Sequence, residues 1–402
     1  MAATIKLGNK EWAAKKDSLL AYNDEDNNFK PLPFDFTRAS SATYVGSDGL
    51  IKTSTTAQPR IDFADNTDGH LLLEPARTNL ITYSEDFSQS YWAKFAPNLT
   101  IVPNAITSPI GTNNASKLVS GSTDAQQAIY KSITQSNCTF SVYAKKAEFD
   151  TVSLKLSGSQ QANFDLTNGT VGYNANVIPA IENVGNGWYR CSITITSGSS
   201  VYAWIAISSG NTQGDQTSGI YIWGAQLEAG AYPTSYIPTN GGSVTRAAET
   251  CDGSGNSQVI NSAEGVLFSE VEFEQTGITN RQICLRDNTW TNRIFLRLDA
   301  TSNQITFRYY IGGSLTINLL HTLTDTTIFN KIACKWELNK FKLYVNGNKV
   351  AEDLSANVMG ADLMNRISFD DGLGTNVFFG EVKQLKVYNT ALKDSELKTL
   401  TT

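Results

Sequence analysis

The chain is poor in charged residues and in the residue types that build reactive sites. Only 17% of its 402 residues are Asp, Glu, Lys or Arg, whereas helical bundles carry many Lys and Glu on their surfaces. A low charged fraction beside abundant Ser, Thr, Asn and Gly favours β-sandwiches with long polar loops. The hydrophobic fraction of 41% is large enough for packed cores, so we do not expect a disordered chain.

Several function classes lack their sequence signals. There is no cluster of five or more Lys and Arg, and the net charge is −6, so we expect no nucleic-acid partner. No apolar run approaches ~18 residues, so we expect no membrane insertion. The N-terminal MAATIKLGNKEW lacks the apolar core of a signal peptide, which predicts synthesis in a cytoplasm without export.

Cysteine and histidine are too sparse to predict a metal site, a redox centre or a catalytic triad. No two cysteines lie within four residues of each other, which removes the CxxC metal and redox motifs, and we expect buried reduced thiols. His70 and His321 lie far apart in the chain, with no triad or zinc pattern around them. We therefore expect no cofactor, no metal and no enzymatic activity. The cysteines are Cys138, Cys191, Cys251, Cys284 and Cys334.

Two acidic motifs are the remaining candidates for chemistry. In SEVEFEQ, strand periodicity places Glu270, Glu272 and Glu274 on one face, as in glycosidases that use paired carboxylates. The ExDxxE pattern of glycosidases with a concanavalin-like fold is missing, so we expect a charge-protected edge strand that opens its domain. Asp370 and Asp371 precede a glycine, which favours a plain turn and leaves a calcium site open.

Alternation of apolar and polar residues predicts an all-β chain with two antiparallel sandwiches. In CTFSVYAKK (138–146), TVSLKLSG (151–158) and GWYRCSITIT (187–196) every second residue is apolar, which is typical of sheets with one buried face. We expect a jelly roll over residues 80–245. A second sandwich over 246–402 has a hairpin turn at Asn346-Gly347 and a closing helix from about Lys393.

Residues 1–79 are predicted as an irregular attachment region. Prolines at 31, 33 and 59 interrupt short extended pieces, and a short helix is expected over residues 10–20. The segment has little apolar mass for its own core. We therefore expect it to wrap on a neighbour, either the next domain or a partner protein.

Aromatic residues in two strands are the best candidates for binding. In VYAWIAI (201–207), Tyr202 and Trp204 share the face opposite the aliphatic residues, and in IYIWGAQ (220–226) Tyr221 and Trp223 do the same. If these strands are neighbours, four rings line one surface. Such a surface suits sugar rings or a protein interface, and the alternative is plain burial. Tyr91 and Trp92 in SQSYWAK are a further pair, for which core packing is favoured.

The order of several phrases carries a family resemblance. They are FTRASSATYVGSDGLIKT (36–53), QPRIDF (58–63), LLLEPARTNLITYSEDF (ending at Phe87) and GAQLEAGAYPTSYIPT (224–239). This order resembles the head-spike and fibre proteins of tailed bacteriophages and related adhesion proteins of marine bacteria, over roughly residues 20–250. The region 80–245 resembles jelly-roll carbohydrate-binding modules. FKLYVNGNKV (341–350) and GEVKQLKVYNTAL from Gly380 resemble concanavalin A-like and laminin-G-like lectin domains.

The resemblance implies a virion surface protein, either a head fibre or a tail-associated fibre. Its lectin-like sandwiches would adhere to host cell-surface glycans, and its N-terminal region would bind other virion proteins. Appendages of this kind are commonly homo-oligomers, often trimers. The alternatives are a purely architectural decoration protein, or a polysaccharide-degrading enzyme with an attached binding module. The glycan, and the choice between head and tail, stay open.

Overall fold

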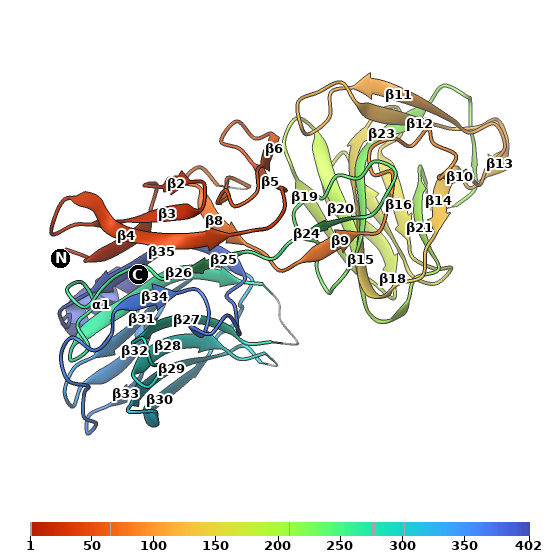
Figure 1. Cartoon of the computed structure of the whole chain (residues 1–402). Coiled ribbons are helices and arrows are strands. Elements are labelled where there is room, and N and C mark those ends of the chain that lie inside the picture. The colour runs from red at the N-terminus through yellow and green to blue at the C-terminus, as the bar shows by residue number, and fades with distance from the viewer. Residues whose placement is uncertain (1, 65, 209, 275–278, 301) are drawn as a thin grey trace. The chain divides into compact units, whose positions relative to one another are not determined.

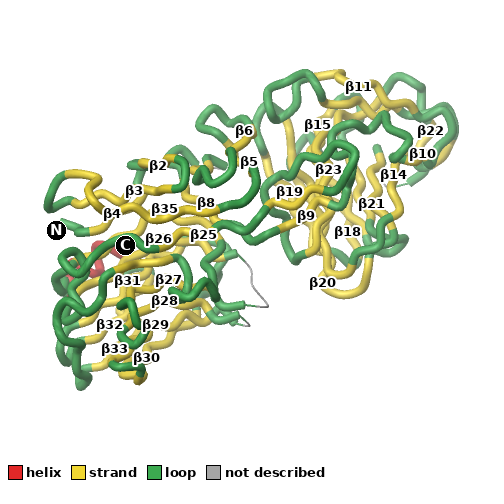
Figure 2. Tube along the Cα trace, in the orientation of Figure 1, coloured by secondary structure: helices red, strands yellow, loops and turns green. Residues whose placement is uncertain are grey.

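The computed structural model describes residues 2–64, 66–208, 210–274, 279–300 and 302–402. Strands and loops make up this part of the chain, apart from the terminal helix α1 (Asp394–Thr401), as Figures 1 and 2 show. The prediction of an all-β fold with a closing helix is therefore confirmed.

The chain forms two compact units, and it passes between them four times. Unit 1 contains Met1–Ser41, Ser54–Pro75 and Ala248–Thr402, and unit 2 contains Ala42–Thr53 and Ala76–Ala247. The limits 76–247 lie close to the jelly roll expected over 80–245. The other two expected regions, 1–79 and 246–402, belong for the most part to one unit.

Unit 2 is a β-sandwich. One sheet has the order β10 (Ala93–Lys94), β14 (Ala128–Ser132), β21 (Tyr202–Ala206), β16 (Thr151–Lys155), β17 (Gln161–Asp165), β18 (Thr170–Ala175). The other has the order β11 (Thr100–Ile106), β12 (Ala115–Val119), β23 (Gly219–Ala229), β15 (Ser136–Lys146), β20 (Trp188–Ser199), β19 (Ile178–Asn183). Short pairs complete it: β5 (Ala42–Val45) with β6 (Ile51–Ser54), β9 (Arg77–Asn79) with β24 (Val244–Arg246), and β13 (Asp124–Ala125) with β22 (Thr212–Gln213).

One hydrophobic core joins the two sheets of unit 2. Phe140 of β15 and Ile193 of β20 lie in the same buried cluster as Leu154 of β16 and Phe164 of β17. These residues are the apolar members of the alternating patterns, because successive side chains of a strand point to opposite faces. The strands predicted at 138–146, 151–158 and 187–196 are confirmed as β15, β16 and β20.

Unit 1 is a second β-sandwich. Its larger sheet has the order β25 (Thr250–Asp252), β4 (Asn28–Thr37), β3 (Ser18–Asn23), β1 (Ile5–Gly8), β35 (Gly380–Tyr388), β26 (Gly265–Phe273), β31 (Asn330–Trp336), β32 (Phe341–Val345), β33 (Asn348–Asp353). Strand β2 (Ala13–Lys15) pairs with β3, and β8 (His70–Leu73) pairs with β7 (Ile61–Asp62) and β35. The smaller sheet has the order β30 (Ser314–Thr322), β29 (Gln304–Ile311), β28 (Arg293–Leu298), β27 (Arg281–Arg286), β34 (Arg366–Ser368).

The prediction of an irregular N-terminal region with a helix over 10–20 is wrong. Most of the segment folds as strands that extend the larger sheet of unit 1, and Ile5 lies opposite Val387 in the β1–β35 register. In Figure 1 these red strands lie beside the blue strand β35. Leu19 and Ala21 are buried in the core of unit 1, so packing of alternate residues overrides local helix propensity. Most of the segment therefore packs on the C-terminal sandwich, whereas residues 42–53 and 76–79 belong to unit 2, the next domain along the chain.

The expectation that the SEVEFEQ strand lies at a sheet edge is also wrong. Strand β26 lies between β35 and β31. The reason is long-range, since the last strand of the chain and the N-terminal strands continue the sheet beyond β26. The predicted hairpin is confirmed, with Asn346 and Gly347 at φ values of 46° and 81° between β32 and β33, a backbone that Asn and Gly tolerate.

The five cysteines are buried and unpaired, as predicted. Burial raises the pKa of the Cys138 thiol to about 11, so this group stays in the unreactive protonated form at neutral pH. In the described part of the chain, no helix is long and apolar enough to cross a membrane.

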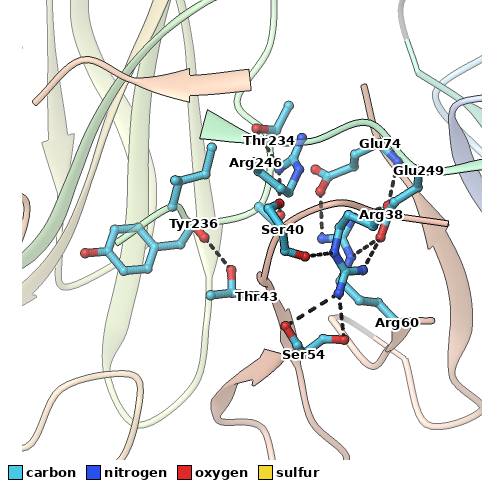
Figure 3. Close-up of polar contacts among 12 residues, drawn as sticks. Arg38, Ser40, Thr43, Ser54, Arg60, Glu74, Thr234, Tyr236, Arg246 and Glu249 are labelled. Carbon is cyan, nitrogen blue, oxygen red and sulfur yellow. Dashed lines mark hydrogen bonds and ion pairs between the residues drawn. The ribbon is translucent and has the colours of Figure 1, made fainter. Parts of the chain in front are cut away.

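A buried charge network lies in unit 1 (Figure 3). Glu249 accepts a hydrogen bond from Arg38 Nη1 at 2.7 Å and from Arg60 Nε at 2.8 Å, and Glu74 lies 2.7 Å from Arg60 Nη1. These four side chains are at most 4% exposed. Burial lowers the pKa of Arg60, but Glu249 and Glu74 outweigh it, so the net shift is upward. Arg38 also binds the hydroxyl of Ser54.

Candidate functional site

The two aromatic strands are not neighbours, so the four expected rings do not share a surface. Strand β21 lies between β14 and β16, whereas β23 lies between β12 and β15 in the opposite sheet. The chain between them crosses the sandwich instead of turning back as a hairpin. Within each strand, the aliphatic side chains point to the core as the alternating pattern predicts, because Ile205 of β21 and Ile222 of β23 are both core residues.

The aromatic residues of β23 are mostly interior. Trp223 is fully buried in a cluster with Tyr143, Trp188 and Tyr236, and its ring centroid lies 4.6 Å from that of Tyr236. Tyr221 is half-buried at the margin of the same cluster. Trp223 is therefore a packing residue and presents no binding surface.

Tyr91 and Trp92 separate into a surface residue and a core residue. Trp92 is 3% exposed, and its indole N–H donates to the carbonyl of Tyr83 at 3.0 Å. Tyr91 is half-buried, and the Lys131 ammonium lies 4.5 Å from the centre of its ring. Core packing therefore holds for Trp92.

The rings of β21 build a different surface, here called the aromatic platform: Phe95, Tyr130, Tyr202 and Trp204. Tyr130 of β14 lies opposite Trp204 in the strand register, and the two rings stack with centroids 5.2 Å apart. Phe95 and Tyr202 contact Trp204 from two other sides, with centroids 4.8 Å and 5.4 Å away. The sandwich core takes the alternate residues of β21, so the platform lies on the outer face of its sheet.

The platform has an exposed ring at its edge and a buried ring at its centre. The Phe95 side chain is 53% exposed, whereas Trp204 is 6% exposed beneath its neighbours. The indole N–H of Trp204 is buried, and the described residues offer it no hydrogen-bond partner. Lys155 lies opposite Trp204 with its ammonium 5.8 Å from the ring centre, and burial lowers the pKa of Lys155. The platform thus offers apolar ring faces, phenol groups and a nearby cation.

Unit 2 also contains a polar pocket, which the sequence did not predict. It has a volume of about 560 Å³, within the ~300–1,000 Å³ range of ligand sites, and lies by β11, β12 and the segments 84–88 and 238–240. Its lining contains two carboxylates, amides and hydroxyls, and includes neither Lys nor Arg. The lining residues are Glu85, Asp86, Ser88, Pro103, Asn104, Asn114, Ser116, Pro238, Thr239 and Asn240.

Glu85 is held in a fixed orientation in this pocket. The hydroxyl of Tyr236 donates to its Oε1 at 3.0 Å, and the amide of Asn114 donates to its Oε2 at 2.8 Å. Burial raises the pKa of Glu85 above its ordinary value, although these hydrogen bonds oppose the shift. Each carboxylate oxygen has a second lone pair, so Glu85 can still accept hydrogen bonds from a ligand.

Two further groups complete the polar lining. Asp86 accepts hydrogen bonds from the backbone N–H of Ser88 and the side chain of Gln89. Burial alone would raise the pKa of Asp86, but these hydrogen bonds outweigh burial and lower the pKa below its ordinary value. The Oδ1 atom of Asn114 is buried, and no described residue donates to it.

The acidic motifs of unit 1 are used within the fold. Glu270 lies 3.0 Å from the Lys383 ammonium and accepts from Gln384. The Asp370 carboxylate accepts from the backbone N–H groups of Gly372 and Gly374, while Asp371 accepts from Leu373 in the same turn. Within the described residues, no group of three or more His, Cys, Asp or Glu side chains is arranged to hold a metal ion.

Sequence reasoning missed Phe95, Tyr130 and every residue of the polar pocket. Tyr130 had a usable signal, since it alternates with the core residue Ile129 in a short strand. The pocket had none, because its residues come from four separate segments whose spacing shows no motif.

No family model matches this chain, and no curated protein matches it. Among solved structures, the CBM40 module of the Ruminococcus gnavus IT-sialidase is 16% identical with a TM-score of 0.32, covering 38% of this chain and 94% of that module. Domain 4 of an extracellular arabinanase from Geobacillus stearothermophilus, in complex with arabinotriose, is 14% identical with a TM-score of 0.30 over 43% of this chain and 84% of that one. Laminin α1 domains LG4-5 of mouse are 10% identical with a TM-score of 0.23, covering 68% and 92%.

Proposed function

We propose that this chain is a non-enzymatic, glycan-binding protein of a bacteriophage surface, either a head fibre or a tail-associated fibre. The virion assignment rests on the ordered phrases between residues 36 and 239, which resemble fibre and head-spike proteins. That resemblance also implies a homo-oligomer, often a trimer, attached to other virion proteins.

The observation that carries glycan binding is the aromatic platform of unit 2. Phe95 is 53% exposed, and the half-buried Tyr130 and Tyr202 add phenol groups beside it. Aromatic faces are attractive to the C–H groups of sugars, and residues with an apolar body and a polar tip are favoured at binding surfaces. The ring of Trp204 supports the other three from below, so the platform is preorganised.

The mechanism is weak contact multiplied by copy number. A small rim of exposed rings gives a modest single-site affinity. Many copies on one particle convert later contacts into intramolecular events and raise avidity without a tighter site. Tight binding by the isolated chain is therefore not required for adhesion.

The test is a glycan array probed with the full chain displayed on beads at high copy number. Replacement of Phe95 by Ala removes an exposed ring with little effect on the core, and we expect binding to fall about tenfold. The matched control is Tyr173→Ala, which removes a ring that is 61% exposed on β18, at the far edge of the same sheet. Equal binding by wild type, Phe95→Ala and the control would refute the platform as the glycan site.

An architectural decoration protein is the second candidate, because an exposed ring such as Phe95 also suits a protein interface. It predicts no glycan binding by the assembled oligomer, together with failed assembly of the Phe95→Ala variant. An assay for new reducing ends or unsaturated products on capsular and algal polysaccharides tests the absence of enzymatic activity. Appearance of product would overturn that part of the proposal.

A further inference from the structure

We propose that the polar pocket of unit 2 is a second glycan site, and that it selects uncharged sugars over acidic ones. This inference rests on the proposed function, since it assigns a ligand class to a site separate from the aromatic platform. The pocket and the platform share no residue, and they are built on different strands: β11 and β12 at the pocket, β14 and β21 at the platform.

The chemistry of the lining favours a ligand with many hydroxyl groups. Eight of the ten lining residues carry polar side chains, and the carboxylates of Glu85 and Asp86 are strong acceptors for hydroxyl donors. The amides of Asn104, Asn114 and Asn240 can both donate and accept. Sugars present alternating donors and acceptors of this kind, whereas an apolar ligand would leave most of the lining without partners.

The geometry shows that the pocket is already organised for a ligand. Glu85 is fixed by Tyr236 and Asn114 before any ligand arrives, which reduces the entropy lost on binding. Tyr236 is itself hydrogen-bonded to the hydroxyl of Ser84 at 2.7 Å.

The charge of the lining sets the selectivity. Two carboxylates and no cation line the pocket, so a uronate, sialate or sulfate group would meet like charge without a counter-ion. Juxtaposed like charges act against the wrong ligand. The platform differs, because Lys155 lies beside its central ring. The two sites therefore differ in the charge of the sugars that they accept. The pocket binds uncharged sugars, and only the platform tolerates acidic sugars.

The test is calorimetric or NMR titration of the full chain with neutral hexose oligosaccharides, with uronate-containing oligosaccharides and with calcium chloride alone. Glu85→Gln removes the charge but nearly keeps the shape, and we expect neutral-sugar affinity to fall about tenfold or more. Asn240→Trp places a bulky side chain at an exposed lining position and should block the pocket without a core substitution. Glu148→Gln is the matched control, since Glu148 pairs with Lys117 outside the pocket.

The outcomes separate this inference from the proposed function. Loss of neutral-sugar binding in Glu85→Gln and Asn240→Trp, with retention in Glu148→Gln and Phe95→Ala, supports the pocket. Binding that is lost only in Phe95→Ala overturns the pocket and leaves the glycan-binding function standing. Preference for uronates at the pocket, or saturable binding of calcium alone that Glu85→Gln abolishes, also overturns it. No glycan binding at all overturns both proposals.

Discussion

Replacing Glu249 by Gln tests whether the buried charge network stabilises unit 1. The Glu249 carboxylate faces the guanidinium groups of Arg38 and Arg60, and it accepts the backbone N–H of Glu74 at 2.9 Å. Both partners of each Arg–Glu249 pair are 0% exposed. Water therefore cannot solvate the two guanidinium groups after Glu249→Gln removes the carboxylate charge. Removing one partner of a buried pair costs about 3–5 kcal/mol. Because m is about 2–3 kcal/mol/M in urea, the urea midpoint of unfolding should fall by roughly 1–2.5 M.

The assay is urea unfolding of the full chain, followed by hydrogen exchange in peptides assigned to each unit. The two units have separate cores, so we expect the loss in unit 1 and little change in the core strands of unit 2. The matched control is Glu352→Gln, which disrupts the Lys349–Glu352 pair, 37% and 34% exposed. Exposed pairs of this kind contribute about 0–1 kcal/mol. If both variants lose the same stability, the network does not hold unit 1 together.

Three further predictions concern single side chains. Burial, with Glu381 and Asp325 nearby, raises the pKa of Glu272 to about 8. The folded state therefore binds this proton more tightly than the unfolded chain, so the stability of unit 1 should fall as pH rises from about 5 to about 8. In urea titrations at several pH values, Glu272→Gln should remove this fall. Trp223→Ala deletes a fully buried ring and should cost unit 2 about 3–5 kcal/mol in urea unfolding; a cost below about 1 kcal/mol would contradict the interior assignment. Burial raises the pKa of Glu85 above its ordinary value, so neutral-sugar affinity measured by calorimetry should weaken as pH is lowered through that pKa and the carboxylate is neutralised, whereas Glu85→Gln should show a flat profile.

Within single strands, the sequence predicted the structure well. The period of two is a local property of extended backbone, so the apolar residues of 138–146 and 187–196 identified the core faces of β15 and β20. Turn chemistry is equally local, and Asn346-Gly347 predicted its hairpin. The buried thiols followed from the same strand patterns.

Pairing between strands was beyond the sequence. The alternation of β21 and β23 identified which of their residues face the sandwich core, but it carries no information on which strand lies beside which. For that reason Tyr202 and Trp204 were expected beside Tyr221 and Trp223, and they lie in opposite sheets. Strand β1 shows the same limit, because its partner β35 is more than 350 residues away in the chain.

Three phrases that carry the family resemblance, together with the segment after them, supply the residues of the buried charge network. Arg38 lies in FTRAS, Arg60 in QPRIDF, Glu74 in LLLEPARTN and Glu249 in TRAAET. Their side chains meet in one buried network inside unit 1. A charged residue in a polar loop and one in a buried ion pair look alike in a sequence.

The amino-acid order by itself determined the all-β class and, in strands such as β15, β16 and β20, the residues that face the core, because these follow from the geometry of neighbouring residues. Only the tertiary structure decided that the first 40 residues complete the last domain, that Phe95 and Tyr130 join Trp204, and that ten residues of four segments enclose the polar pocket. Such associations depend on the pairing of distant strands, and the free energy that selects one pairing comes from the whole core.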